Sequence, residues 1–133
     1  MSQQNKSISN YHSICKKTFS DCQIITNITI PNSIHIIEDL AFTGCVSLEV
    51  VTMPNVYFIG KSSFKGCISL KKLTISANYS NIEQSAFEGC SKLSEIIYQN
   101  DTKLKNISDG EIGDFAFKGC STLKNILISD FIQ

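Results

Sequence analysis

The sequence has no excess of charge of either sign, no apolar run long enough to span a bilayer and no apolar stretch near its N-terminus. Its 12 basic and 12 acidic residues cancel, so electrostatics give no reason to expect nucleic acid or an anionic membrane as a partner. A spanning helix needs about 20 consecutive apolar residues, and insertion into a membrane is not expected. Residues 1–10 form a polar tail without the apolar segment of a secretory signal. This composition predicts a cytoplasmic protein.

The sequence also lacks the motifs that mark common catalytic and metal sites. It has no Cys-x-x-Cys pair and no glycine-rich phosphate loop. Its two histidines, His12 and His35, belong to no Ser/His/Asp or Cys/His motif. Cys15 is the best candidate for a reactive thiol, but an ordinary thiol is the better expectation. We therefore predict no catalytic residues, no metal, no cofactor and no small-molecule substrate.

The chain does contain an internal repeat. The string Phe-x-Gly-Cys occurs four times, and a fifth, weaker copy has Asp21 in place of the glycine. Successive repeat cysteines lie 23, 22, 23 and 30 residues apart, and apolar residues recur three, six and eight residues after each. The phenylalanine and cysteine of each copy are Phe19 and Cys22, Phe42 and Cys45, Phe64 and Cys67, Phe87 and Cys90, and Phe117 and Cys120.

Each unit is predicted to form one short strand and a return turn. Around the apolar pair that follows each cysteine, alternate side chains point to one face, and Pro31 and Pro54 end that strand in two units. A small residue before each phenylalanine suits a tight turn or a short helix. Such units bury their apolar faces only by stacking. The expected fold class is α/β: a right-handed leucine-rich-repeat solenoid of about five repeats of ~23 residues, with a parallel sheet on one face and short helices or turns.

Stacking makes two further predictions about side chains. The five repeat cysteines should form an inward ladder of buried, reduced thiols, because free cysteine is among the most buried residue types. His12 and His35 occupy the same position in neighbouring units, which makes them candidates for stacked neighbours on the surface.

The repeat resembles the leucine-rich repeats of the BspA-like (Treponema pallidum) class. The match to that class runs through Cys45, Leu48, Val51, Met53, Pro54, Val56, Ile59, Gly60 and Phe64, and the likeness covers about residues 11–128. The resemblance implies a binding role. Proteins similar to this one include surface adhesins, whereas other leucine-rich-repeat proteins are intracellular scaffolds and enzyme regulators.

Residues between the buried strand positions face outward on the predicted sheet. They form the candidate protein-binding or self-association face: Val50, Thr52, Lys72, Thr74, Glu95, Ile97, Asn125 and Leu127. One interpretation of such positions is a solvated face rich in strand-forming threonine. Ile97 and Leu127 would, however, be exposed apolar neighbours, and exposed apolar patches often mark contacts.

We predict a single domain over residues 11–133, with an insertion within 99–111 and an open C-terminal end. The insertion indicates a tolerated surface loop, because Asp101, Asp109 and Glu111 lack the spacing of an EF-hand. The sequence stops soon after its last strand, at Phe131 and Ile132. An uncapped strand edge is a template for association, so we expect a homo-oligomer that forms through this end, the sheet face or both.

The leading hypothesis is a non-catalytic protein-protein interaction module: an intracellular scaffold, or a regulator of a signalling enzyme, that also self-associates. The alternative is a cell-surface adhesin of BspA type without a recognisable signal peptide. An enzyme with an unrecognised site is the remote alternative, since a site needs convergent ionisable groups in a concave pocket.

Overall fold

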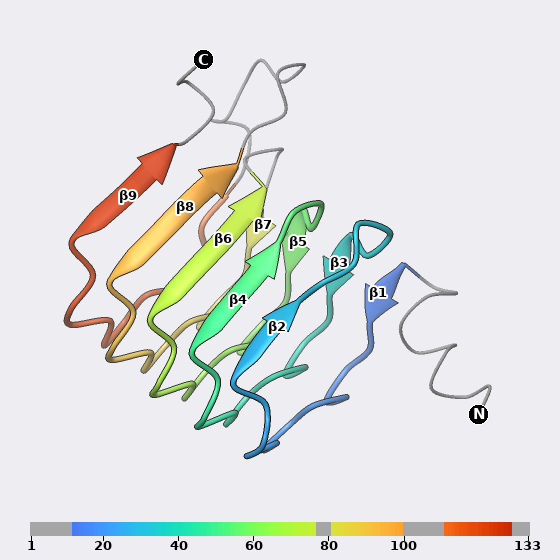
Figure 1. Cartoon of the computed structure of the whole chain (residues 1–133), viewed down its shortest axis with the longest axis horizontal. Helices are drawn as coiled ribbons and strands as arrows, with labels where there is room; N and C mark the ends of the chain where they lie inside the picture. The colour runs from blue at the N-terminus through green and yellow to red at the C-terminus, as the bar shows by residue number, and fades with distance from the viewer. Residues whose placement is uncertain (1–11, 77–80, 100–110, 129–133) are drawn as a thin grey trace.

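The computed structural model describes residues 12–76, 81–99 and 111–128 and shows a parallel β-solenoid (Figure 1). Five strands form what we call the long-strand sheet, in the order β2-β4-β6-β8-β9. Four strands of two residues form the short-strand sheet, in the order β1-β3-β5-β7. The long strands are β2 (Asn27–Thr29), β4 (Val50–Met53), β6 (Lys72–Ser76), β8 (Glu95–Gln99) and β9 (Asn125–Ile128). The short strands are β1 (Ser13–Ile14), β3 (Ile36–Ile37), β5 (Phe58–Ile59) and β7 (Asn81–Ile82).

Every strand pair is parallel and keeps the repeat in register. In the long-strand sheet Val51 pairs with Leu73, and Leu73 pairs with Ile96. In the short-strand sheet Ile37 pairs with Ile59, and an isolated bridge from Ile82 to Ile112 continues the row. Each residue therefore lies beside the residue at the same repeat position, as the sequence predicts.

The return turns are joined to one another by a third set of backbone hydrogen bonds. The Phe42 amide donates to the Ser63 carbonyl at 2.7 Å, and the Phe64 amide donates to the Ala86 carbonyl at 2.8 Å. Each turn of chain is thus bonded to the next along both sheets and along the return turns. We call the run of return turns the turn side.

The predicted parallel-sheet solenoid is confirmed, but its α/β label is not supported, because the described ranges contain strands and turns and no helix. In the fourth unit Ser85 and Gly89 have φ values of 59° and 82°, in the left-handed region. The equivalent positions of the other units are also left-handed. A right-handed helix cannot pass through such residues. The amides therefore alternate: those of Ser85, Phe87 and Gly89 bond to the next unit, and those of Ala86 and Glu88 bond to carbonyls three residues earlier in the same turn.

The short-strand sheet is a second departure from the sequence prediction, which placed a parallel sheet on one face only. Its strands contain two residues each. Alternation of polar and apolar residues cannot be recognised over so short a run. The recurring isoleucine five residues before each phenylalanine is the inward residue of these strands, as the full burial of Ile37 and Ile59 shows.

The core is a set of identical residues stacked along the solenoid. The rings of Phe42 and Phe64 lie 4.9 Å apart at 6°, and those of Phe64 and Phe87 lie 5.1 Å apart at 7°. All three are fully buried. Stacked rings of this kind add about 0.5–1.5 kcal/mol per pair beyond their burial.

The repeat cysteines form the predicted inward ladder. Cys45, Cys67 and Cys90 are fully buried, and every cysteine is a free thiol. The Cys67 thiol donates to the Phe42 carbonyl at 3.3 Å, and the Cys90 thiol donates to the Phe64 carbonyl at 3.2 Å. Contact with the Cys67 thiol and burial both raise the pKa of Cys45 above its ordinary value, and burial raises the pKa of Cys120. The thiols of Cys45 and Cys120 therefore keep their protons at neutral pH.

Replacing Ser63 with alanine should stabilise the protein. Ser63 is fully buried and its hydroxyl oxygen has no hydrogen-bond partner, which costs about 1 kcal/mol or more. We expect Ser63→Ala to raise the free energy of unfolding in urea by about 1 kcal/mol. Ala86→Ser, at the same position of the next unit, is the matched control and should lower it. A Ser63→Ala protein less stable than wild type would show that the hydroxyl has a partner.

Stability should decline at alkaline pH. A thiol whose pKa is raised on folding stabilises the folded state below its unfolded pKa of about 9, and this contribution is lost as pH rises through the higher folded pKa. We expect the free energy of unfolding to fall above pH 9, by at most roughly 1.4 kcal/mol per pH unit for each of the thiols whose pKa is raised, which are those of Cys45, Cys67 and Cys120. Urea titrations from pH 7 to 10.5 measure the slope. Cys67→Ala should flatten it, and an unchanged slope would exclude the ladder as its source.

Candidate protein-binding face

The outer face of the long-strand sheet carries two rows of side chains across the strands. Thr29, Thr52, Thr74 and Ile97 form one row, because each pairs with the next in the parallel register. Val50, Lys72 and Glu95 belong to the second row. The structure thus brings together six of the predicted face residues. Asn125 and Leu127 pair through their backbones with Glu95 and Ile97, but their side chains lie outside the described part.

This face is more tightly packed than the sequence suggests. Ile97, which the sequence predicts to be exposed, is instead half-buried, and so are Val50 and Thr52. Thr74 lies between Thr52 and Ile97 and is 8% exposed. Neighbouring side chains therefore cover one another along the row of Thr52, Thr74 and Ile97, whereas Lys72 in the second row stays exposed.

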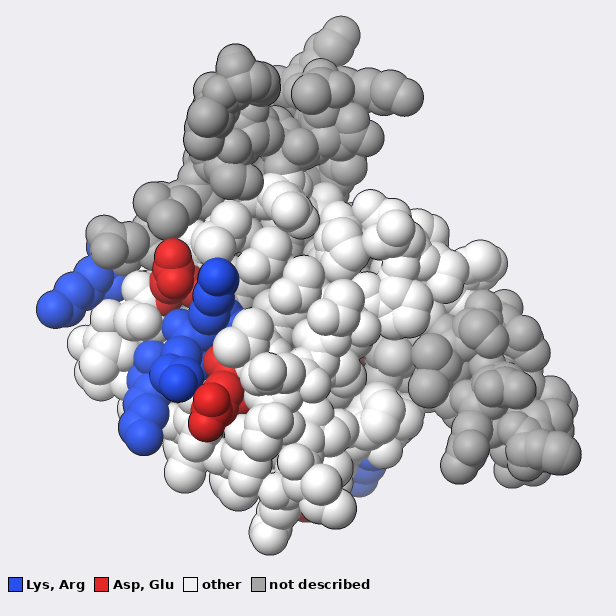
Figure 2. Space-filling model, in the orientation of Figure 1, with Lys and Arg blue, Asp and Glu red and all other residues white. Residues whose placement is uncertain are grey.

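Charged side chains on this face gather at one end of the strands. Figure 2 shows them at the left of the view, over the starts of β6, β8 and β9, with a broad uncharged area beside them. Lys71 and Glu49 form an ion pair at 3.4 Å, and Lys72 pairs in register with Glu95. Both signs occur together, so the charged end has no strong preference for an acidic or a basic ligand.

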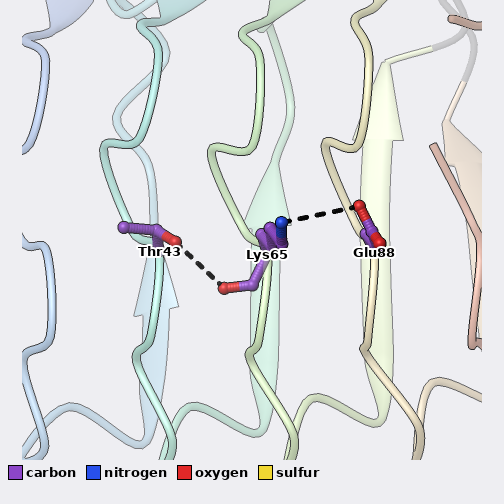
Figure 3. A network of polar contacts seen from close by, with 3 residues as sticks. All are labelled: Thr43, Lys65 and Glu88. Carbon is purple, nitrogen blue, oxygen red and sulfur yellow. Dashed lines mark hydrogen bonds and ion pairs between the residues drawn. The ribbon is translucent and has the colours of Figure 1, made fainter. Parts of the chain in front are cut away.

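The turn side carries polar contacts between repeats. The Thr43 hydroxyl donates to the Lys65 carbonyl at 3.2 Å, and the Lys65 ammonium lies 3.7 Å from the Glu88 carboxylate (Figure 3). A hydrogen bond from Ser85 and the nearby charges of Lys65 and Lys118 lower the pKa of Glu88. Exposed ion pairs of this kind add little to stability, so this is a solvated surface.

The predicted stacking of the two histidines is confirmed and extends to a third ring. His12 and His35 stack at 5.8 Å and 19°, and His35 and Tyr57 stack at 5.5 Å and 18°. The Nδ1 atoms of His12 and His35 lie 3.0 Å from the Ser33 carbonyl and 3.1 Å from the Asn55 carbonyl. A carbonyl oxygen only accepts, so Nδ1 carries the proton. Apart from its place in the repeat register, no feature of the sequence points to Tyr57 as part of this stack.

A pocket of about 190 Å³ opens beside the short-strand sheet, lined by Lys16, Glu38, Asp39 and Phe58. Its carboxylates already accept hydrogen bonds that join repeats: Glu38 accepts from the Ser13 hydroxyl and the Lys16 amide, both at 3.2 Å. Across the described ranges, no three His, Cys, Asp or Glu side chains converge in a way that could hold a metal ion. In the same ranges, no helix is long and apolar enough to cross a membrane.

Several predicted features lie wholly or partly outside the description. Phe131 and Ile132, the 1–10 tail and residues 100–110 of the insertion are not among the described residues. Gln99 and Glu111, at either end of the insertion, are exposed. Cys15 is half-buried. Sequence reasoning missed two exposed apolar residues of the last unit, Ile112 and Phe115, which are 63% and 57% exposed.

The repeat pattern described as the BspA type leucine rich repeat region matches residues 12–133 in six copies. The chain belongs to this family. A search of curated proteins finds no match. In this chain, successive copies of the family's repeat pair in register in both sheets.

Solved structures of bacterial leucine-rich-repeat proteins are similar to this BspA-type chain. One, from Bacteroides ovatus, has a TM-score of 0.63 and 28% identity over 84% of this chain and 27% of its own. Another, from Eubacterium ventriosum, has a TM-score of 0.58 and 18% identity over 80% and 33%, and supports the fold alone. A leucine rich cell surface protein from Faecalibacterium prausnitzii has a TM-score of 0.50 and 27% identity over 78% and 32%. The chain thus spans about a third or less of their lengths.

Proposed function

We propose that this BspA-type chain is a non-catalytic protein-binding module that acts as one domain over residues 11–133. Its binding surface is the outer face of the long-strand sheet. The observation that carries the proposal is the broad uncharged area of that face, with Val50, Thr52 and Ile97 half-buried on neighbouring strands. Leucine-rich-repeat folds generally bind other proteins, which fits such a surface.

The face suits a protein ligand for two physical reasons. Its backbone is bonded to neighbours within the sheet, so little ordering entropy is lost on binding. Its centre is uncharged, so covering it leaves no buried charge unpaired. The charged end, with Lys72 exposed and Glu95 half-buried, would act as a polar rim that fixes orientation and contributes little affinity.

For its location, we propose the cell surface in place of the cytoplasm that the sequence alone suggests. One of the similar structures is described as a cell surface protein, which supports this choice. An intracellular scaffold or enzyme regulator is the second candidate. Protease treatment of intact source cells separates the two: loss of the protein, with a cytosolic marker kept, is expected for the surface. Full protection would favour the intracellular role.

A lysine at the centre of the face should abolish binding without loss of the fold. Ile97→Lys places an unpaired charge in the uncharged area, so a bound partner would have to bury it. We expect proteins captured from the source by the wild-type chain to be lost with Ile97→Lys and kept with Gln84→Lys, an exposed position outside this sheet. Circular dichroism checks the fold. Equal capture by all three proteins would place the binding surface elsewhere.

The face is also a candidate for self-association. If two copies meet through it, Ile97→Lys lowers the solution mass measured by light scattering in the presence of reductant. If the variant keeps the wild-type mass, the face does not bind a second copy and remains free for a foreign partner.

A further inference from the structure

The pocket beside the short-strand sheet is built by three successive units. Lys16 comes from the first unit, Glu38 and Asp39 follow β3 in the second, and Phe58 lies in β5 of the third. The volume of the pocket is about 190 Å³, and a cavity of roughly 150 Å³ already holds a benzene-sized group. The pocket therefore has room for the end of one side chain.

Contacts from the units on both sides hold the two carboxylates of the pocket in place. Glu38 accepts hydrogen bonds from the first unit, and Asp39 Oδ1 accepts one from the Lys61 amide of the third unit at 2.9 Å. Gly60 makes the contact with Lys61 possible, because a Cβ atom at residue 60 would lie 2.7 Å from Asp39 Oδ1. Both carboxylates are thus fixed before a ligand arrives, which lowers the entropy cost of binding.

The pocket contains groups that its own surroundings leave without a partner. Asp39 Oδ2 accepts no hydrogen bond from the described residues. Among the same residues, no ring or cation lies against the half-buried Phe58. The Lys16 ammonium forms no ion pair with either carboxylate in the described ranges. An ionised carboxylate oxygen and the face of an aromatic ring both attract a cation, so Asp39 and Phe58 together suit a cationic ligand.

Charge on this side of the solenoid favours the same kind of ligand. The stretch from six to three residues before each repeat phenylalanine holds five acidic residues and two lysines. They are Glu38, Asp39, Glu83, Glu111 and Asp114, against Lys16 and Lys61. An excess of one sign raises the local concentration of oppositely charged groups. The short-strand side therefore attracts cations, whereas the charged end of the long-strand sheet mixes both signs.

A guanidinium group fits this pocket better than an ammonium group. A guanidinium is planar, stacks on aromatic faces and presents several N–H donors to a carboxylate, whereas an ammonium is a compact and strongly hydrated charge. All 12 basic residues of the sequence are lysines, so a second copy of this chain does not supply a guanidinium. The ligand group has to come from a different molecule.

We propose that the pocket binds the side chain of an arginine on an exposed segment of a partner protein. The guanidinium lies against the Phe58 ring and donates a hydrogen bond to Asp39 Oδ2, and Glu38 adds negative charge beside it. The pocket lies on the short-strand side, so it gives the proposed binding module a second surface and does not use the outer face of the long-strand sheet.

A blocked arginine tests the site directly. The probe is Nα-acetyl-arginine amide, and its matched control is Nα-acetyl-citrulline amide, in which an uncharged urea replaces the guanidinium at nearly the same shape. In the isotope-labelled full chain, the amide signals of Lys16 and Lys61 report binding, because these two groups donate to Glu38 and Asp39. We expect both signals to shift and saturate with the arginine compound, and the citrulline compound to bind about tenfold more weakly or less.

Variants of the pocket residues separate the contributions. Asp39→Asn keeps an acceptor for the Lys61 amide but removes the charge, and should weaken arginine binding about tenfold. Phe58→Leu removes the ring and should weaken it roughly threefold. Lys16→Gln removes a like charge from the pocket and should tighten it roughly threefold. Glu88→Gln, a half-buried carboxylate on the turn side, is the matched control and should change nothing.

Equal binding of the arginine and citrulline compounds, or unchanged binding by Asp39→Asn, would overturn the proposal. So would the lack of any saturable shift at the Lys16 and Lys61 amides. Free arginine that binds more tightly than the blocked compound would also contradict a protein ligand, because the site would then recognise the free amino acid. Ile97→Lys distinguishes the two surfaces: it should keep arginine binding, even where it abolishes partner capture by the long-strand sheet.

Discussion

The structure depends on one constraint, which is that successive turns of chain hydrogen-bond to each other in register on every side. Because the two sheets and the turn side all keep the same one-to-one pairing, each side chain must fit against its own equivalent in the next unit. Phe64 therefore meets Phe42 and Phe87, and Cys67 occupies a column of cysteines. The fit is close at Gly60, where a Cβ atom would lie 2.7 Å from the Asp39 amide nitrogen.

This constraint decides what the sequence could reveal. Inward residues can be predicted from the sequence, because a stacked column needs the same kind of residue at a fixed spacing. Leu48, Leu70 and Leu93 are all fully buried, as expected. Outward residues obey no such rule. The position of Ile97 on the face follows from its register, but the burial of Thr74 depends on side chains from two neighbouring strands, which a single repeat does not show.

The turns show why short helices could not be excluded from local sequence. The position two residues before each phenylalanine is left-handed in all five units, but it is occupied by residues as different as Lys17, Leu40 and Phe115. A non-glycine residue costs about 1–2 kcal/mol in this conformation. The inter-repeat hydrogen bonds and ring stacks on either side hold the turn in place in spite of that cost. Because the inter-repeat part of this energy comes from neighbouring units, a window of sequence within one unit does not predict it.

The direction of stacking also separates packing from recognition. Contacts between units run along the solenoid, through both sheets and the turn side, whereas the outer face of the long-strand sheet lies across that direction. Thr52 and Ile97 are therefore only partly covered by their neighbours in the row. A ligand that lies along this row would meet several strands at once, so contacts that are weak on each strand can add up over the face.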